Sequence, residues 1–220
     1  ASVRVEALDR LAQLDQMPAP ALDIAARLLD DGDDGVIRAA VRLLARSPRD
    51  CPEAVPRLLA LARRPPLEDS CSPDHALQMA LSRTAGSSVD LLVAALRGPD
   101  PRVREIVLVA LTGIGDRAGA AVPEAVRLLR GGRMESHGAE LLLSRHRERA
   151  RTALEPLTKD GDPDVRRTAL EILGGTGNAA IVAGLDDSDE GVRQSAIHHF
   201  GRRVAAGDRS AVDGLLKGLQ

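Results

Sequence analysis

The chain has 220 residues, with 30 Lys and Arg against 32 Asp and Glu, which gives a formal net charge of -2 at pH 7. This balance excludes the simplest electrostatic case for nucleic-acid binding, which requires a net basic domain. Hydrophobic residues make up 44% of the chain, but Phe200 is its single aromatic residue. A core of Ala, Leu, Val and Ile favours an all-α fold, and the lack of aromatic side chains excludes base stacking as a mode of recognition.

No apolar run approaches the roughly 20 residues that span a bilayer. The first residue, Ala1, leads directly into patterned sequence, without a charged and then apolar leader. We therefore expect a cytoplasmic protein with no membrane partner. Because the pattern starts and stops in mid-repeat, we expect a segment of a longer protein or a chain that lacks terminal caps.

Two cysteines, Cys51 and Cys71, are too few for a disulfide framework, so we expect reduced thiols. Cys71 and His75 are four residues apart, as metal ligands on one helical turn would be, and Cys51 is a possible third ligand. Three candidates spread across a loop do not make a structural metal site. We expect neither a metal nor another cofactor.

A repeat organises the whole chain. After Val3, Val36, Val103, Val165 and Val192, apolar residues recur four, five and eight positions later, which is one face of an α-helix. Two of the intervals between these valines are of double length. Degenerate copies near Pro73 and Met134 fill them, so the pattern predicts about seven such helices.

The ends of these helices also have signals. An Asp stands just before four of the copies and predicts an N-cap, and in two copies Pro101 or Pro163 follows it. Glycines predict where the helices stop. The capping residues are Asp33, Asp100, Asp162 and Asp189, and the stops are Gly113, Gly174 and Gly201.

Between these helices a second pattern predicts partner helices. It is clearest at residues 54–59, 121–126 and 211–216, and it recurs more weakly at 21–29, 89–96, 153–157 and 179–185. Pro156 either opens a late, short helix or bends one that begins near Glu148.

Two helices of about ten residues per repeat resemble the bacterial HEAT-like family, of the type first noted in phycobilisome lyases. The motifs that carry the resemblance are Asp-Pro-x-Val-Arg at 100–104 and 162–166, and Ala-Val-Pro at 54–56 and 121–123. The resemblance covers essentially the whole chain. It implies an α-α superhelix, a HEAT/armadillo-like solenoid of about seven helix pairs that forms a single domain over residues 1–220. It says almost nothing about function.

An arginine recurs just after the repeated valine, where a nucleic-acid reader could present a row of cations. We favour a structural role, in which the arginine of one repeat bridges to the capping Asp of a neighbour and fixes the stacking. The expected ladder consists of Asp100, Arg104, Asp162, Arg166, Asp189 and Arg193.

Charge is segregated along the chain. Residues 15–34 contain six Asp and one Arg, whereas residues 127–151 contain seven Arg and three Glu. The basic stretch is either a binding site for an acidic segment, a phosphate or a nucleic-acid backbone, or a solvated surface. Its candidate contacts are Arg127, Arg130, Arg133, Arg145, Arg149 and Arg151.

Catalytic motifs are missing from the sequence. There is no nucleotide-binding glycine loop and no His-Glu dipeptide of the kind that binds iron in HEAT-fold hydroxylases. His198 and His199 are the nearest feature, and we expect both to face outward or sideways. We therefore expect no enzyme activity.

The leading hypothesis is a protein-binding scaffold that uses the curved surface lined by the second helices. Arg57, Arg63 and Arg64 are candidate contacts there, together with the basic stretch. The alternative is a lyase-like accessory enzyme or a nucleic-acid or phosphate-binding module centred on residues 127–151, and a deep pocket around His137 and His146 would favour it. We expect sequence-specific nucleic-acid binding to be absent, and we expect the uncapped ends to make end-to-end or dimer contacts.

Overall fold

The computed structural model describes residues 1–14, 17–65, 73–131, 133–174, 179–208 and 211–217, although the side chains of 73, 133–136, 179–180, 214–215 and 217 are not described. Within these ranges the chain forms α-helices and short 3-10 helices and no strand. The prediction of an all-α fold is therefore confirmed.

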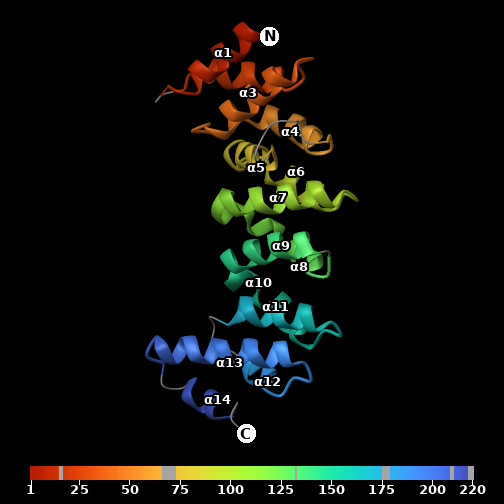
Figure 1. Ribbon diagram of the computed structural model, residues 1–220, viewed down its shortest axis with the longest axis vertical. Coiled ribbons are helices and arrows are strands. Elements are labelled where there is room, and N and C mark those ends of the chain that lie inside the picture. The colour runs from red at the N-terminus through yellow and green to blue at the C-terminus, as the bar shows by residue number, and fades with distance from the viewer. Residues whose placement is uncertain (15–16, 66–72, 132, 175–178, 209–210, 218–220) are drawn as a thin grey trace. The chain divides into compact units, whose positions relative to one another are not determined.

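Fourteen α-helices follow one another along the described chain as seven pairs, as the repeat predicted. Odd-numbered helices are the first members of the pairs and even-numbered helices the second (Figure 1). The first helices are α1 (Ser2–Leu11), α3 (Asp34–Ala45), α5 (Pro73–Thr84), α7 (Pro101–Ile114), α9 (Arg133–Arg145), α11 (Pro163–Leu173) and α13 (Glu190–Ala205). The second helices are α2 (Ala19–Leu28), α4 (Val55–Ala62), α6 (Val89–Leu96), α8 (Val122–Leu128), α10 (Arg147–Leu154), α12 (Ala179–Gly184) and α14 (Val212–Lys217). The 3-10 helices are η1 (Pro52–Ala54), η2 (Gly115–Ala121) and η3 (Glu155–Lys159).

The helices form two compact units, Ala1–Glu124 and Ala125–Gln220. In the first unit α1, α3, α5 and α7 pack in succession, and α2, α4 and α6 each contact the first helix of the next pair. In the second unit α9, α11 and α13 pack in succession, and α10 and α12 contact the next first helix in the same way. Within each unit the helices thus stack pair on pair. A single solenoid over 1–220 stays a prediction.

The predicted N-caps are confirmed. A carboxylate oxygen of Asp33 accepts a hydrogen bond from the Val36 amide at 3.1 Å, and Asp189 does the same for Val192 at 3.1 Å. Asp100 accepts from the amide of Arg102, and Asp162 from that of Asp164. Each cap satisfies an amide that has no partner within its own helix.

The predicted helix stops are only partly correct. Gly174 is the residue that ends α11, but Gly113 lies inside α7 and Gly201 inside α13. The glycines that follow these two helices with positive φ are Gly115 at 80° and Gly207 at 90°. A backbone turn with positive φ needs glycine, whereas an isolated glycine within a helix costs too little to end it.

One helical stretch, Pro101–Leu128, contains a window that is apolar and long enough to cross a membrane by length and composition alone. A buried core helix passes the same test, so the expectation of no membrane partner stays a prediction. In the structure this stretch is divided into α7, η2 and α8, with the backbone of Gly115 turning at a positive φ between the first two. The buried faces of α7 pack on α5 and α6 within the first unit.

The expectations for Pro156 are also resolved. The chain continues from α10 into the 3-10 helix η3, which contains Pro156 near its start. The proline therefore changes the α-helix that begins at Arg147 into a 3-10 helix, because its ring and missing amide hydrogen prevent a regular α-helix from continuing.

The core of the second unit brings Phe200 together with aliphatic side chains of α11, α12 and α13, among them Leu170, Ile181 and Val192. Near this cluster the imidazole of His199 lies over Gly174. A Cβ atom at position 174 would overlap Nδ1 and Cε1 of His199, far inside van der Waals contact. The close approach of α11 and α13 therefore requires glycine at this position.

We expect Gly174→Ala to lower the free energy of unfolding by about 1–3 kcal/mol, because the added methyl group displaces the imidazole from a packed site. Urea denaturation followed by circular dichroism measures this change. The matched control is Gly201→Ala, since position 201 is also helical but a methyl group added there would meet no atom within 4 Å. We expect that control to raise stability by about 0.5–1 kcal/mol. A Gly174→Ala variant as stable as the parent would contradict the packing described.

Candidate functional site

At three turns, successive helix pairs are joined by an Asp that stands two residues before the N-cap. Oδ1 of Asp187 accepts a hydrogen bond from the amide of Asp189 at 2.9 Å. Both oxygens of Asp187 also accept hydrogen bonds from Arg166, at 2.8 Å from Nε and 2.8 Å from Nη2. These two side chains are only 12% and 13% exposed. A bidentate pair with this degree of burial links α11 to the turn before α13.

The same arrangement recurs at two other turns. Asp31 accepts from the amide of Asp33 and forms an ion pair with Arg4 of the preceding pair. Asp160 accepts from the amide of Asp162 in the same way, but its ion pair is with Arg130, which follows the second helix α8 and does not lie on a first helix. In the sequence these turns have the pattern Asp-x-Asp. Only the second Asp of the pattern, which is the N-cap, was predicted from the sequence, and the first was missed.

These contacts lower the pKa of two of the linking carboxyls. For Asp187 the largest cause is the hydrogen bond from Arg166, and for Asp160 it is the hydrogen bond from the Asp162 amide, followed by that from Arg130. Both groups therefore keep their charge well into the acidic range.

The residues of the predicted ladder make the following contacts, and the ladder itself stays a prediction. Asp100, Asp162 and Asp189 cap their own helices, as described above. Arg104 donates to the carbonyl of Gly98, and Arg193 to the carbonyls of Asp187 and Ser188, so both hold the turn that leads into their own helix. Arg166 likewise donates to a backbone carbonyl of the turn before its own helix, that of Asp160. It also forms the ion pair with Asp187 in the turn before α13.

Ion pairs also connect successive second helices, and they involve arginines that the sequence offered for partner binding. Nε of Arg57 lies 2.6 Å from Asp30, and Nε of Arg97 lies 2.6 Å from Glu124. Arg130 pairs with Asp160. Arg57 and Arg130 therefore have partners within the chain, although exposed pairs of this kind are weak and exchange readily.

The other predicted contact residues lie at several places. Arg63 and Arg64 are exposed directly after α4, and the carbonyl of Arg64 accepts a hydrogen bond from Arg102. Arg151 is partly buried and pairs with Glu148 at 3.3 Å. Exposed side chains are those of Arg127, Arg145 and Arg149, and the side chain of Arg133 lies outside the described residues.

Second helices expose large aliphatic side chains at intervals. In the first unit these are Ile24 of α2 and Leu91 of α6, and in the second unit Val182 of α12 and Val212 and Leu216 of α14. Each is the kind of side chain that a bound partner would cover.

A groove of about 800 Å³ lies in the second unit, between η3 and the turn that follows α12. Its surface combines small apolar groups, such as Ala183 and Gly184, with charged groups of both signs. Neither His137 nor His146 lines this groove. His137 is exposed on α9, and His146 is buried at the start of α10. The lining comprises Glu155, Thr158, Lys159, Asp160, Arg166, Ala183, Gly184, Asp186, Asp187 and Ser188.

The His198–His199 pair differs from the expectation. His198 is exposed, but His199 is only 8% exposed, and its Nε2 has no hydrogen-bond partner among the described residues. Burial lowers the pKa of His199, and the charges of His198, Arg202 and Arg147 lower it further. The imidazole is therefore neutral at pH 7.

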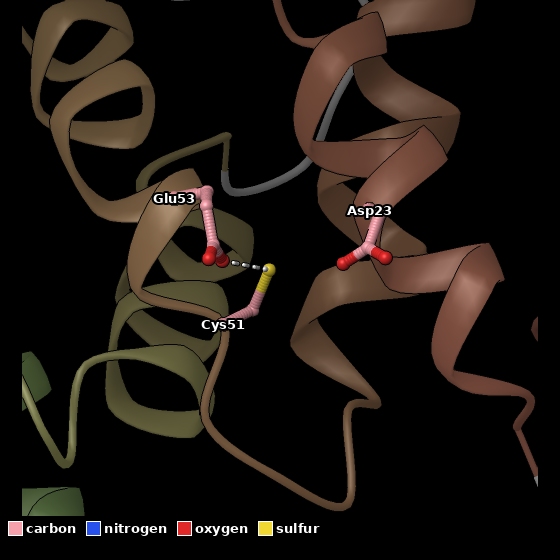
Figure 2. Close-up of side chains that lie close together, drawn as sticks. All are labelled: Asp23, Cys51 and Glu53. Carbon is pink, nitrogen blue, oxygen red and sulfur yellow. Dashed lines mark hydrogen bonds between the residues drawn. The ribbon is translucent and has the colours of Figure 1, made fainter.

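A small cluster of possible metal ligands lies in the first unit, around Cys51 (Figure 2). It contains Asp23, Cys51 and Glu53, whose ligand atoms all lie within 4.8 Å of one another. Of the ligands considered from the sequence, Cys51 belongs to this cluster, whereas Cys71 lies outside the described residues and His75 is an exposed residue of α5.

Comparison with known proteins gives one family match. Residues 150–220 match the family model of HEAT repeats. This HEAT segment runs from within α10 to the end of the chain. No curated protein matches the chain. The phycobilisome-lyase type of HEAT repeat stays a prediction.

Among the solved structures similar to the chain are engineered proteins and designed armadillo repeat proteins. One engineered protein is 20% identical over 99% of this chain and 68% of its own, with a TM-score of 0.47. Another is 20% identical over 79% of this chain and 91% of its own, with a TM-score of 0.42. A designed armadillo repeat protein in complex with the peptide (KR)4 is 16% identical over 98% of this chain and 90% of its own, with a TM-score of 0.38. These likenesses are too low to support any statement about function.

We expect the second unit to lose stability in acid because of His199. Its pKa in the folded chain lies below the ordinary value of 6.5, so the unfolded chain binds this proton more readily. The stabilisation that the neutral His199 imidazole gives the folded state is therefore complete above pH 6.5 and falls as the pH decreases through that value. Urea denaturation across this range should show a smaller pH dependence for His199→Gln than for the parent.

The matched control for this measurement is His137→Gln, which replaces an exposed imidazole on α9 of the same unit. It should keep the pH dependence of the parent. If His199→Gln kept it as well, the buried neutral state of His199 would be refuted.

Proposed function

We propose that the protein is a scaffold that binds a segment of another protein on the second helices of a unit. The observation that carries this proposal is the set of aliphatic side chains that these helices expose within each unit, Ile24 and Leu91 in the first unit and Val182, Val212 and Leu216 in the second. Exposed aliphatic groups that recur on equivalent helices are typical of a docking face.

Charged groups on and beside the second helices support this function. Arg57 on α4, Arg97 after α6 and Arg130 after α8 form exposed, exchangeable ion pairs with carboxylates of neighbouring repeats, so they can also contact a partner. Charged groups give specificity at the rim of an interface, while the aliphatic groups contribute most of the affinity. In the second unit the groove beside Ala183 would accept an extended segment.

Substitutions on the two kinds of helix test the proposal. The second-helix variants are Leu91→Asp and Val182→Asp, at side chains 44% and 43% exposed, and the first-helix controls are Leu141→Asp and Ile197→Asp, at 44% and 38%. Peptides are first selected on the parent protein from a random library displayed on phage. We expect a peptide that binds either unit to lose at least about tenfold in affinity with the second-helix variant of that unit.

The controls should leave the affinity unchanged, because they add the same charge at a similar exposure on the other face. Thermal unfolding by circular dichroism confirms that all four variants are folded. Selected peptides that respond to Leu141→Asp or Ile197→Asp, and not to the second-helix variants, would contradict the proposed face.

A second candidate is the binding of an acidic segment by the basic stretch. The observation in its favour is that the side chains of Arg127, Arg145 and Arg149 are exposed in the second unit. Cations that face solvent attract polyanions over a distance set by the salt concentration.

We expect the triple variant Arg127→Glu, Arg145→Glu, Arg149→Glu to bind a fluorescent poly-glutamate peptide at least about tenfold more weakly than the parent at low salt. Fluorescence anisotropy measures the affinity. The matched control reverses the same number of exposed arginines elsewhere, at Arg27, Arg46 and Arg83. Equal losses in the two triple variants would show an effect of net charge alone and would reject a site in the basic stretch.

A further inference from the structure

Asp23, Cys51 and Glu53 come from two neighbouring helix pairs. Asp23 belongs to α2, Cys51 precedes η1 directly, and Glu53 lies within η1. Figure 2 shows the thiol of Cys51 on the side of its backbone that faces the carboxylates. Only 3% of Cys51 is exposed, whereas both carboxylates reach solvent. A solute could therefore approach the carboxylates and meet the sulfur behind them.

The two carboxylates carry negative charge that no cation of the described residues neutralises. Within that part of the chain, neither Asp23 nor Glu53 forms an ion pair with Arg or Lys. The guanidinium nearest in sequence, that of Arg57, donates instead to the backbone carbonyl of Glu53 and to the carboxylate of Asp30. Two like charges beside a buried thiol are costly unless a cation joins them.

Distances within the cluster suit a tetrahedral ion. With Zn–S bonds of about 2.3 Å and Zn–O bonds of about 2.1 Å, sulfur and oxygen ligands are separated by about 3.6 Å. Sγ of Cys51 lies 3.8 Å from Oε2 of Glu53 and 4.0 Å from the carbonyl oxygen of Leu22. Small side-chain rotations close the remaining difference, because all three ligand atoms already lie within 4.8 Å of one another.

We propose that Asp23, Cys51 and Glu53 form a binding site for one Zn²⁺ ion, with water or the Leu22 carbonyl as the fourth ligand. A thiolate with two carboxylates favours Zn²⁺ over Mg²⁺ or Ca²⁺, which take oxygen ligands alone. The thiol releases its proton to solvent when the metal binds. The ion would join α2 to η1 and so link the first two helix pairs.

Burial raises the pKa of Cys51, and the charges of Glu53 and Asp23 add to this effect. The metal-free thiol is therefore protonated at neutral pH and is a poor nucleophile. A bound cation would remove the effect of both carboxylates. This site does not depend on the proposed scaffold function and is tested separately.

Cobalt titration of the full chain tests the site. The variant Cys71→Ser leaves Cys51 as the only thiol in the chain. We expect Co²⁺ to give a thiolate-to-metal absorption band with a stoichiometry of one, and Zn²⁺ to displace it. On the same background, Asp23→Asn and Glu53→Gln should each weaken cobalt binding at least about tenfold.

The matched control is Asp90→Asn, since Asp90 is an exposed carboxylate near the start of second helix α6. It should leave the cobalt affinity unchanged. Cys51→Ser should abolish the band, and because a buried substitution can also affect folding, the two exposed carboxylate variants decide the result. A band that is absent at millimolar Co²⁺, or that persists unchanged in both Asp23→Asn and Glu53→Gln, would overturn the proposal.

Discussion

At three turns between helix pairs, the stacking depends on one carboxylate that is shared between two repeats. Asp31, Asp160 and Asp187 each accept a hydrogen bond from the amide of the capping Asp and form an ion pair with an arginine earlier in the chain. The first bond sets the turn into the next helix, and the second sets the distance between repeats. Because both require one position of the carboxylate, the local turn and the packing of neighbouring pairs are coupled.

This coupling also determines which polar groups remain for a partner. Arg57 on α4 and Arg130 after α8 have charges that suit binding, but their guanidinium groups already contact carboxylates of adjacent repeats. The exposed aliphatic side chains of the second helices, such as Leu91 in the first unit and Val182 in the second, leave apolar area to be buried. With only one aromatic residue in the chain, and that one buried, docking would depend on these small apolar groups.

The periodic part of the structure could be predicted from the sequence, because each first helix has its own cap and its own apolar face. The Asp33 and Asp189 caps are examples, since the bond from side chain to amide spans three residues. Contacts across repeats could not be predicted in the same way. His199 is buried because Gly174, 25 positions earlier, leaves room for its ring, and Asp23 meets Cys51 only after α2 and η1 have packed. Neither arrangement follows the repeat, so the period carries no signal for it. The helix ends at Gly113 and Gly201 were mispredicted because glycine was weighed without its φ angle.

The most direct measurement of the central claim is a double-mutant cycle between Arg166 and Asp187, in which each residue is replaced by Ala alone and together and the free energy of unfolding is determined in urea. If the shared carboxylate couples α11 to the turn before α13, the double variant will be destabilised by clearly less than the sum of the two single variants. Strict additivity of the two single effects would contradict the account, because it would mean that the pair seen between these repeats contributes nothing to their stacking.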